Sequence, residues 1–187
     1  ATRFGVSDFS KTLFCAGNEK TYAFLFDLLD EITEVFPSPY FHIGGDESLK
    51  SEWKRCEACQ RVRREQGLKN ERELQGYFLN RVIAHLEQRG KRVLVWNDGL
   101  CDTLSSSAIC QYWVPFTVEG PDRTARYINA GGAAILSPVT RVYYDYPYAA
   151  TPLKKTYGVQ PTLLGVRKKN EKNILGIEAA IWTEWID

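Results

Sequence analysis

The sequence has few of the residues on which several common kinds of site depend. Its 187 residues contain no methionine and only two histidines, His42 and His85. Two imidazoles are too few for the histidine-rich metal centres of many hydrolases. Basic and acidic residues number 24 and 23, so no positive excess favours nucleic acid or an anionic membrane. No apolar run approaches the roughly 20 residues of a transmembrane helix, and we expect neither a membrane span nor a signal peptide in this chain.

The missing methionine also bears on the ends of the chain. The chain starts at Ala1, whereas an untouched translation product starts with methionine, so we expect a processed chain or an excised segment. The length allows one core of good size. No linker or low-complexity segment interrupts it, and residues 1–187 are therefore expected to form a single domain.

The five cysteines are an odd number, so they cannot all pair within one chain. Cys56 and Cys59 form a Cys-x-x-Cys motif. A zinc site would need a second such pair or nearby histidines, so we expect no structural zinc and no cofactor. A local disulfide and two plain thiols both remain open for this pair.

Apolar spacing predicts helices that alternate with strands. Helices are expected at 20–36, 71–88 and 121–130, with helical turns between Lys50 and Arg64. Continuous apolar strands are expected at 40–44, 93–96, 108–113, 133–137 and 174–182, and a long aromatic loop over 141–157. Such strands are typical of a parallel sheet covered by helices, which indicates an α/β fold.

Five strands are too few for a closed (β/α)8 barrel, which has eight strands and roughly 250 residues. An open arc would leave unpaired strand edges, which proteins usually cover. We therefore predict a partial (β/α)8 TIM barrel with its helices outside, and three strands missing, on the N-terminal side.

The stretch His42-Ile43-Gly44-Gly45-Asp46-Glu47 is the most informative part of the sequence. Neighbours on a regular strand point to opposite faces, so two adjacent acids could not share a pocket. Gly44 and Gly45 permit a sharp turn that would bring both into one cavity. Close carboxylates perturb each other's pKa values, so one can stay protonated and act as a general acid. Gly-Gly-Asp-Glu could also be a solvated turn, but its position after an apolar strand favours a site.

Polar or aromatic residues follow the other predicted strands as well. In a (β/α)8 barrel the active site lies at this carboxyl-terminal edge. The residues concerned are Trp96 to Asp98, Gln111 to Trp113, Tyr143 to Asp145, and Trp182 to Glu184. Each has a structural alternative: Trp96 and Trp182 could be core residues, Asp98 a cap and Asp145 part of an ordinary loop.

These segments together resemble family 20 glycoside hydrolases, the β-N-acetylhexosaminidases. The matching segments, in order, are His42–Glu47, Leu74–Phe78, the Trp96 strand end, Tyr143–Asp145 and Gly176–Glu184. The resemblance covers nearly all of the chain and implies about strands four to eight of the family barrel. It also implies hydrolysis of terminal β-linked N-acetylglucosamine or N-acetylgalactosamine with retention, in which the substrate's own acetamido oxygen forms an oxazolinium intermediate.

The resemblance assigns a role to each residue. Glu47 would be the general acid and base, and Asp46 would orient the acetamido N–H. Tyr143 would donate a hydrogen bond to the acetamido oxygen, although Tyr144 is a one-residue alternative. Asp145 and Glu184 would bind sugar hydroxyls. The tryptophans Trp96, Trp113 and Trp182 would wall the pocket, and Asp98 is a further substrate-binding candidate.

The chain departs from the family at both ends, since an upstream Arg and a His–Asp pair have no counterpart and the last helix is absent. The fragment alone is therefore expected to lack part of the sugar site. One alternative is a carbohydrate-binding barrel remnant without turnover. Another is a metal-dependent hydrolase using His42, Asp46, Glu47 and Asp98. Glycans containing N-acetylhexosamine are the expected partners, and export to the periplasm, cell surface or medium is the expected location.

Overall fold

The computed structural model describes residues 13–114 and 120–183 of the chain. The chain divides into two compact units. The first comprises 1–93 and 101–105, and the second comprises 94–100 and 106–187. Among the described residues no helix is both long and apolar enough to cross a membrane.

The first unit is built mainly from helices. They are α1 (Glu19–Val35), α2 (Ser51–Arg55), α3 (Glu57–Glu65) and α4 (Glu71–Glu87). Strand β1 (Tyr40–His42) and the start of β2 (Arg92–Trp96) also belong to this unit.

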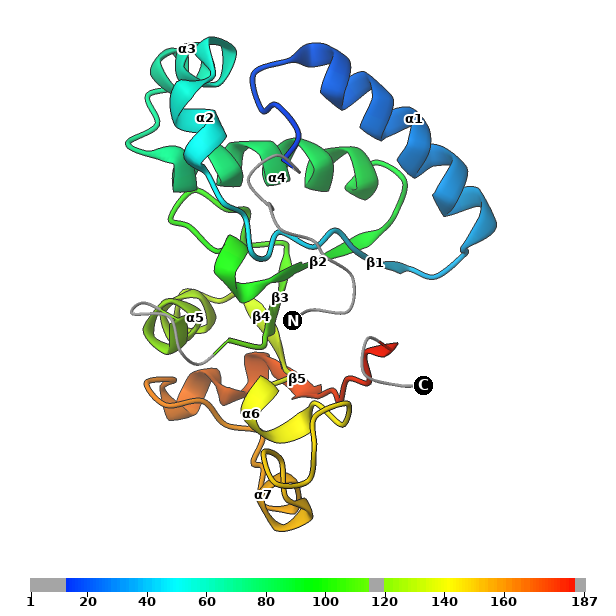
Figure 1. Cartoon of the computed structure of the whole chain (residues 1–187), viewed down its shortest axis with the longest axis vertical. Helices are drawn as coiled ribbons and strands as arrows, with labels where there is room; N and C mark the ends of the chain where they lie inside the picture. Colours follow the sequence, from blue (N-terminus) through cyan, green and yellow to red (C-terminus); the bar gives the residue numbers. More distant parts are fainter. Residues whose placement is uncertain (1–12, 115–119, 184–187) are drawn as a thin grey trace. The chain divides into compact units, whose positions relative to one another are not determined.

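Helix α1 begins and ends where the sequence predicts. The Asn18 side chain accepts a hydrogen bond from the Lys20 N–H and so caps the first turn. The helix ends at Val35, just before the two prolines that follow. It lies beside α4 (Figure 1), and Arg81 of α4 makes a two-pronged ion pair with Glu19, at 2.6 and 2.8 Å.

Helix α4 contributes more buried apolar side chains than any other helix of the first unit. Asn70 caps it by accepting hydrogen bonds from the Arg72 and Glu73 N–H groups. Leu74, Leu79, Val82, Ile83 and Leu86 are all buried. Gly90, with φ of 72°, lies just beyond the helix end, in a conformation that favours glycine.

The second unit holds the rest of the sheet and the remaining helices. Its strands are β3 (Ile109–Tyr112), β4 (Ala133–Leu136) and β5 (Ile174–Ile177). Its helices are α5 (Gly120–Asn129), α6 (Val139–Val142) and α7 (Leu153–Tyr157), with 3-10 turns η2 (Asn97–Gly99) and η3 (Lys168–Asn173).

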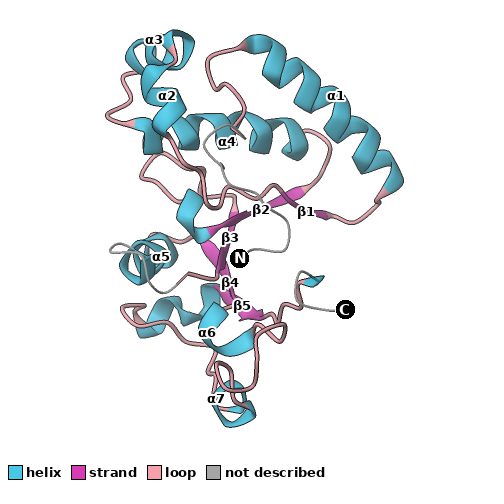
Figure 2. Ribbon diagram, in the orientation of Figure 1, coloured by secondary structure: helices cyan, strands magenta, loops and turns pink. Residues whose placement is uncertain are grey.

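The strands run in the order β1-β2-β3-β4-β5. The pairs β2–β3, β3–β4 and β4–β5 are all parallel (Figure 2), and Cys110 is in register with Ala134. The predicted α/β character and the parallel sheet are therefore confirmed.

Two predictions about the second unit are wrong. The segment 174–182 was expected to be one buried strand, but β5 stops at Ile177, and Leu175 is 52% exposed. As the last strand in the sheet order, β5 pairs on one side only. Its alternate residues Leu175 and Ile177 are exposed, so one face of this strand is uncovered. The segment 141–157 is also more than a loop, because it includes the end of α6 and the whole of α7.

Candidate active site

The acid pair lies on an unusual turn after β1. Gly44 and Gly45 have φ of 72° and 95°, in the left-handed region that glycine tolerates. Glu47 follows with φ of 45°, and it is the one non-glycine residue with positive φ in the described ranges 13–114 and 120–183. Such a conformation costs about 1–3 kcal/mol and persists only where surrounding contacts impose it. The backbone is therefore held in a shape that sets the direction of Glu47.

A side chain from α4 holds this turn in place. The Gln75 amide nitrogen donates to the Gly45 carbonyl at 2.7 Å and to the Ser48 hydroxyl at 3.1 Å. Ser48 in turn donates to the carbonyl of Asp46 at 3.1 Å. Gln75 is only 2% exposed, so these bonds are shielded from water. The sequence placed Gln75 in a matching segment but gave it no role.

The acids themselves are exposed, whereas the sequence led us to expect a cavity. The side chains that the structure describes leave Asp46 and Glu47 open to solvent. His42 is half-buried, and its Nδ1 accepts the Gly44 N–H at 3.0 Å, so this histidine supports the turn. Within the described part of the first unit, His42, Asp46 and Glu47 do not gather into a group of metal-ligating atoms.

Four predicted site residues of the second unit form an aromatic cluster: Trp96, Trp113, Tyr143 and Trp182. The Trp96 ring lies 6.1 Å from that of Trp113 and 6.2 Å from that of Trp182, centroid to centroid. The Tyr143 ring lies 6.4 Å from Trp113, nearly parallel to it, and 6.2 Å from Trp182. Trp182 remains 45% exposed, so the aromatic cluster offers an accessible apolar surface of the kind that receives a sugar ring or a methyl group.

A buried asparagine, Asn97, fixes the segment after β3 that carries Trp113. The side-chain oxygen of Asn97 accepts hydrogen bonds from the backbone N–H groups of Trp113 and Val114, at 2.9 and 3.2 Å. The side-chain nitrogen of Asn97 donates to the backbone carbonyl of Val114. The Trp113 indole N–H donates to Asp98 at 3.1 Å. Asp98 therefore orients Trp113, a role that the sequence did not indicate.

Backbone pairing positions Tyr143. Tyr143 forms an isolated parallel bridge with Ala180, and the Tyr144 N–H donates to the Ala180 carbonyl at 2.8 Å. The Tyr143 side chain is 5% exposed and the Tyr144 side chain 49% exposed. Of the two alternatives, Tyr143 therefore belongs to the aromatic cluster. Both tyrosines line a neighbouring pocket of about 280 Å³, together with Tyr146, Tyr148, Thr151, Leu153 and Thr156.

The carboxylate of Asp145 is a buried hydrogen-bond acceptor. Both of its carboxylate oxygens are buried, and neither has a hydrogen-bond partner among the described residues. A buried carboxylate without donors is costly, so such a group normally meets them in a ligand or an ordered water. Glu184, the other predicted hydroxyl-binding acid, lies outside the described residues.

A second polar network crosses the sheet beside these residues. Gln111, 3% exposed, donates from its amide nitrogen to Ser137 at 3.0 Å and to Glu178 at 2.8 Å. Gln111 is therefore a buried polar residue of the sheet. The participation of Glu178 was missed, because the apolar residues around it made its segment look like an ordinary buried strand.

The Cys-x-x-Cys motif has a third partner that the sequence did not reveal. All five cysteines are free thiols, and Cys15 lies 3.6 Å from both Cys56 and Cys59, sulfur to sulfur. Burial raises the pKa of Cys59 to about 12. At Cys56 burial acts in the same direction, but hydrogen bonds from Cys59, Cys15 and Ala58 outweigh it and lower the pKa.

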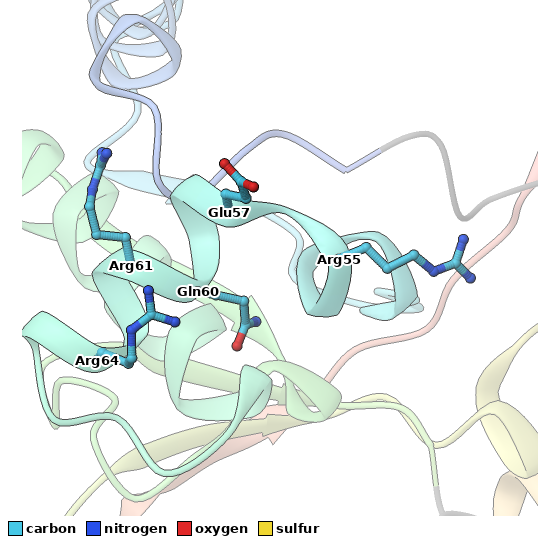
Figure 3. Close-up of a pocket in the computed structure, with 5 residues that line it drawn as sticks. All are labelled: Arg55, Glu57, Gln60, Arg61 and Arg64. Carbon is cyan, nitrogen blue, oxygen red and sulfur yellow. The ribbon is translucent and has the colours of Figure 1, made fainter.

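A separate pocket of about 420 Å³ opens over α2 and α3 (Figure 3). Its walls are Arg55, Glu57, Gln60, Arg61 and Arg64. None of the predicted site residues takes part, and the side chains of Arg55 and Arg61 point away from each other. The pocket therefore has no part in the candidate active site.

Comparison with known proteins decides the family. A profile of the glycosyl hydrolase family 20 catalytic domain matches residues 3–187, which is almost the whole chain. This chain belongs to glycosyl hydrolase family 20. A β-hexosaminidase of Porphyromonas gingivalis is 33% identical over 186 residues, which cover 93% of this chain and 23% of that protein.

The fold of this chain is also similar to that of solved structures of family 20 proteins. A chitobiase of Flavobacterium johnsoniae shares 29% identity with a TM-score of 0.73, over 92% of this chain and 27% of that one. An exo-β-N-acetylglucosaminidase of Vibrio harveyi, solved with N-acetylglucosamine, shares 28% identity with a TM-score of 0.77, over 94% of this chain and 29% of that one. The present chain thus spans about a quarter of the length of these family 20 proteins.

Proposed function

We propose that the full-length protein is a β-N-acetylhexosaminidase that removes terminal β-linked N-acetylglucosamine or N-acetylgalactosamine from glycans. The observation that carries this proposal is the turn at the acid pair. A glutamate held at positive φ, two residues after a pair of left-handed glycines, is a strained arrangement, and such strain is concentrated at functional sites. A simple solvated turn has no need of a buried glutamine to hold it.

The family mechanism gives each residue of the turn a task. Glu47 protonates the leaving oxygen and later takes a proton from water. Asp46 orients the acetamido N–H and stabilises the positive charge that develops on that group. The acetamido oxygen of the substrate attacks the anomeric carbon, so no nucleophile from the enzyme is needed.

The second unit supplies groups suited to hold the sugar. Tyr143 donates its hydroxyl hydrogen to the acetamido oxygen, which orients the nucleophile. Orientation alone can lower a barrier by several kcal/mol, up to about 7–11 in ideal cases. The aromatic cluster packs against the acetamido methyl and the sugar ring. Asp145, whose oxygens are buried and without partners among the described residues, accepts hydrogen bonds from sugar hydroxyls, and Glu184 is assigned the same task.

We further propose that the five strands are strands four to eight of the family barrel and that residues 1–187 are one part of the catalytic domain. The upstream strands would then complete the sugar site and cover the acids that are exposed here. Export to the periplasm, cell surface or medium is consistent with a glycan substrate.

The test is whether hydrolysis depends on the acetamido group. The full-length protein should release the aryl group from aryl N-acetyl-β-glucosaminide or its galactosaminide counterpart. It should leave aryl β-glucoside, which has a hydroxyl in place of the acetamido group, essentially intact. Equal rates on both kinds of substrate would contradict substrate assistance. Binding of N-acetylglucosamine without turnover would favour a carbohydrate-binding remnant.

A further inference from the structure

Three cysteines from distant parts of the sequence meet at the start of α3. Cys15 precedes α1, Cys56 is the residue before α3, and Cys59 lies in its first turn. Their sulfur atoms all lie within 4.8 Å of one another. In the ranges 13–114 and 120–183, no other three or more histidine, cysteine, aspartate or glutamate side chains bring their ligand atoms together in this way.

The sulfur spacing fits a shared metal ion better than a disulfide. The sulfur of Cys15 is 3.6 Å from the sulfurs of both Cys56 and Cys59. A disulfide has a sulfur–sulfur distance of about 2.05 Å, and it could join Cys15 to only one of the two. Sulfurs placed about 2.3 Å from a zinc ion at tetrahedral angles are about 3.8 Å apart. The two distances of 3.6 Å are close to that edge length.

The backbone around the thiols is packed so that Cys15 has little freedom. A Cβ on Gly17 would lie 2.2 Å from the carbonyl carbon of Ala58, so only glycine lets this segment approach α3 so closely. The Trp53 indole N–H donates to the Phe14 carbonyl at 2.9 Å, and the Tyr22 hydroxyl donates to the Ala16 carbonyl at 2.7 Å. The residues on both sides of Cys15 are thereby anchored.

Hydrogen bonds and apolar packing surround the three sulfurs. Backbone N–H groups of Ala58 and Cys59 donate to the Cys56 sulfur, and that of Gly17 donates to the Cys59 sulfur. Trp53 and Leu74 belong to the same buried cluster as Cys59, and Cys15 and Cys56 pack against it. Donors to the ligand atoms and an apolar surround are the outer-shell features that orient ligands and tune metal sites.

We propose that Cys15, Cys56 and Cys59 together bind one zinc ion, with a water molecule as the fourth ligand. Thiolates are soft ligands that favour zinc over magnesium or calcium, and zinc accepts three protein ligands and a water. The ion would tie the segment before α1 to the start of α3. Only α2 and a short loop separate α3 from Glu47, so the site would steady the chain that leaves the acid pair. It does not depend on the proposed hydrolase activity.

The test uses reduced, metal-free full-length protein titrated with zinc against a chromophoric chelator. We expect one high-affinity equivalent that is lost, or weakened at least tenfold, in Cys15→Ser. Cys101→Ser is the matched control, because Cys101 is also a partly exposed thiol of the first unit but lies outside the trio. It should keep the affinity of the parent. Absence of this equivalent in the parent, or its survival in Cys15→Ser, would overturn the proposal.

A second measurement needs no variant and so does not depend on a substituted chain folding. Zinc should protect Cys15 and Cys56, the two partly exposed thiols of the trio, together from alkylation by iodoacetamide. The buried Cys59 should stay unreactive in both states, and Cys101 should react at the same rate with and without the metal. Mass spectrometry of the peptides identifies the protected thiols. Protection of only one of Cys15 and Cys56, or of neither, or a disulfide from Cys15 in reduced and zinc-loaded protein, would overturn the proposal.

Discussion

The hydrogen bonds of Gln75 give a sharp test of how the acid pair is held. Its amide nitrogen donates to the Gly45 carbonyl and the Ser48 hydroxyl from a position that is 2% exposed. Gln75→Glu keeps the size of the side chain but places a carboxylate oxygen where the donor was. Two hydrogen bonds are lost, and an oxygen then faces the Gly45 carbonyl at about the same distance.

The expected effect follows from these contacts. Each lost bond is worth about 0.5–1.5 kcal/mol, and a buried acceptor left without a donor costs about 1–3 kcal/mol. These contributions sum to about 2–6 kcal/mol, and we take the lower part, about 2–3 kcal/mol, as the expected loss of the observed turn relative to other conformations of the loop. At about 1.4 kcal/mol for each factor of ten, the share of molecules with Glu47 correctly placed falls by about 30- to 150-fold if alternative turns lie close in energy.

The assay compares kcat and KM for aryl N-acetyl-β-glucosaminide in the full-length protein. A displaced general acid should lower kcat by up to this factor and change KM little, since the sugar contacts proposed for the second unit are untouched. Gln88→Glu makes the same substitution at an exposed position just after α4 and should leave both constants within about twofold. A Gln75→Glu enzyme with normal kcat, or an equal loss in Gln88→Glu, would refute the reasoning.

Three further predictions concern other contacts. Asp145→Asn should lower kcat/KM by about 10- to 150-fold, chiefly through KM, because hydrogen bonds to a charged acceptor are worth about 1.5–3 kcal/mol; an unchanged KM would contradict its proposed role. Tyr143→Phe keeps the ring in the aromatic cluster and should lower kcat by about 100-fold, a typical effect of removing one donor. The hydrogen bond from Arg89 outweighs desolvation and, together with that from His85, holds the pKa of Asp30 below its ordinary value of 3.8. The contacts of Asp30 therefore stabilise the packing of α1 fully above pH 3.8, and this stabilisation is lost as the pH falls through the lower pKa of the folded state. Hydrogen exchange of α1 amides should show this loss of protection in acid, and Asp30→Asn should reduce its pH dependence.

Much of the fold could be predicted because local signals and tertiary structure agree. Asn18, the apolar spacing of α1 and the prolines after it mark one helix fully, and the continuous apolar runs of β2, β3 and β4 indicate buried parallel strands. The prediction for 174–182 was wrong because an apolar run does not report whether a strand has neighbours on both sides. Here the pairing of β5 with β4 ends at Ile177, and the run continues as irregular chain.

The supporting residues of the site were harder to find than its acids. Gly-Gly-Asp-Glu is a local pattern, but Gln75 acts on it from about 30 positions further along the chain. Asn97 and Cys15 have the same character, since their partners lie 16 and 41 residues away or more. Nothing in the immediate sequence of such a residue indicates which distant group it will meet. Polar side chains at the buried face of a helix, such as Gln75, are the one local hint that was available.

The assignment of Glu47 as the general acid is tested most directly by measuring, in the full-length protein, how the activity of Glu47→Gln depends on the leaving group. A general acid contributes about 10²- to 10⁴-fold, and its help is needed most when the departing phenol is a weak acid. We predict a loss of that size in kcat/KM for such a substrate and a much smaller loss for a strongly acidic phenol. The Glu34→Gln control, at an exposed position on α1, should behave as the parent does. Equal losses on both substrates, or no loss on either, would contradict the assignment of Glu47 as the general acid.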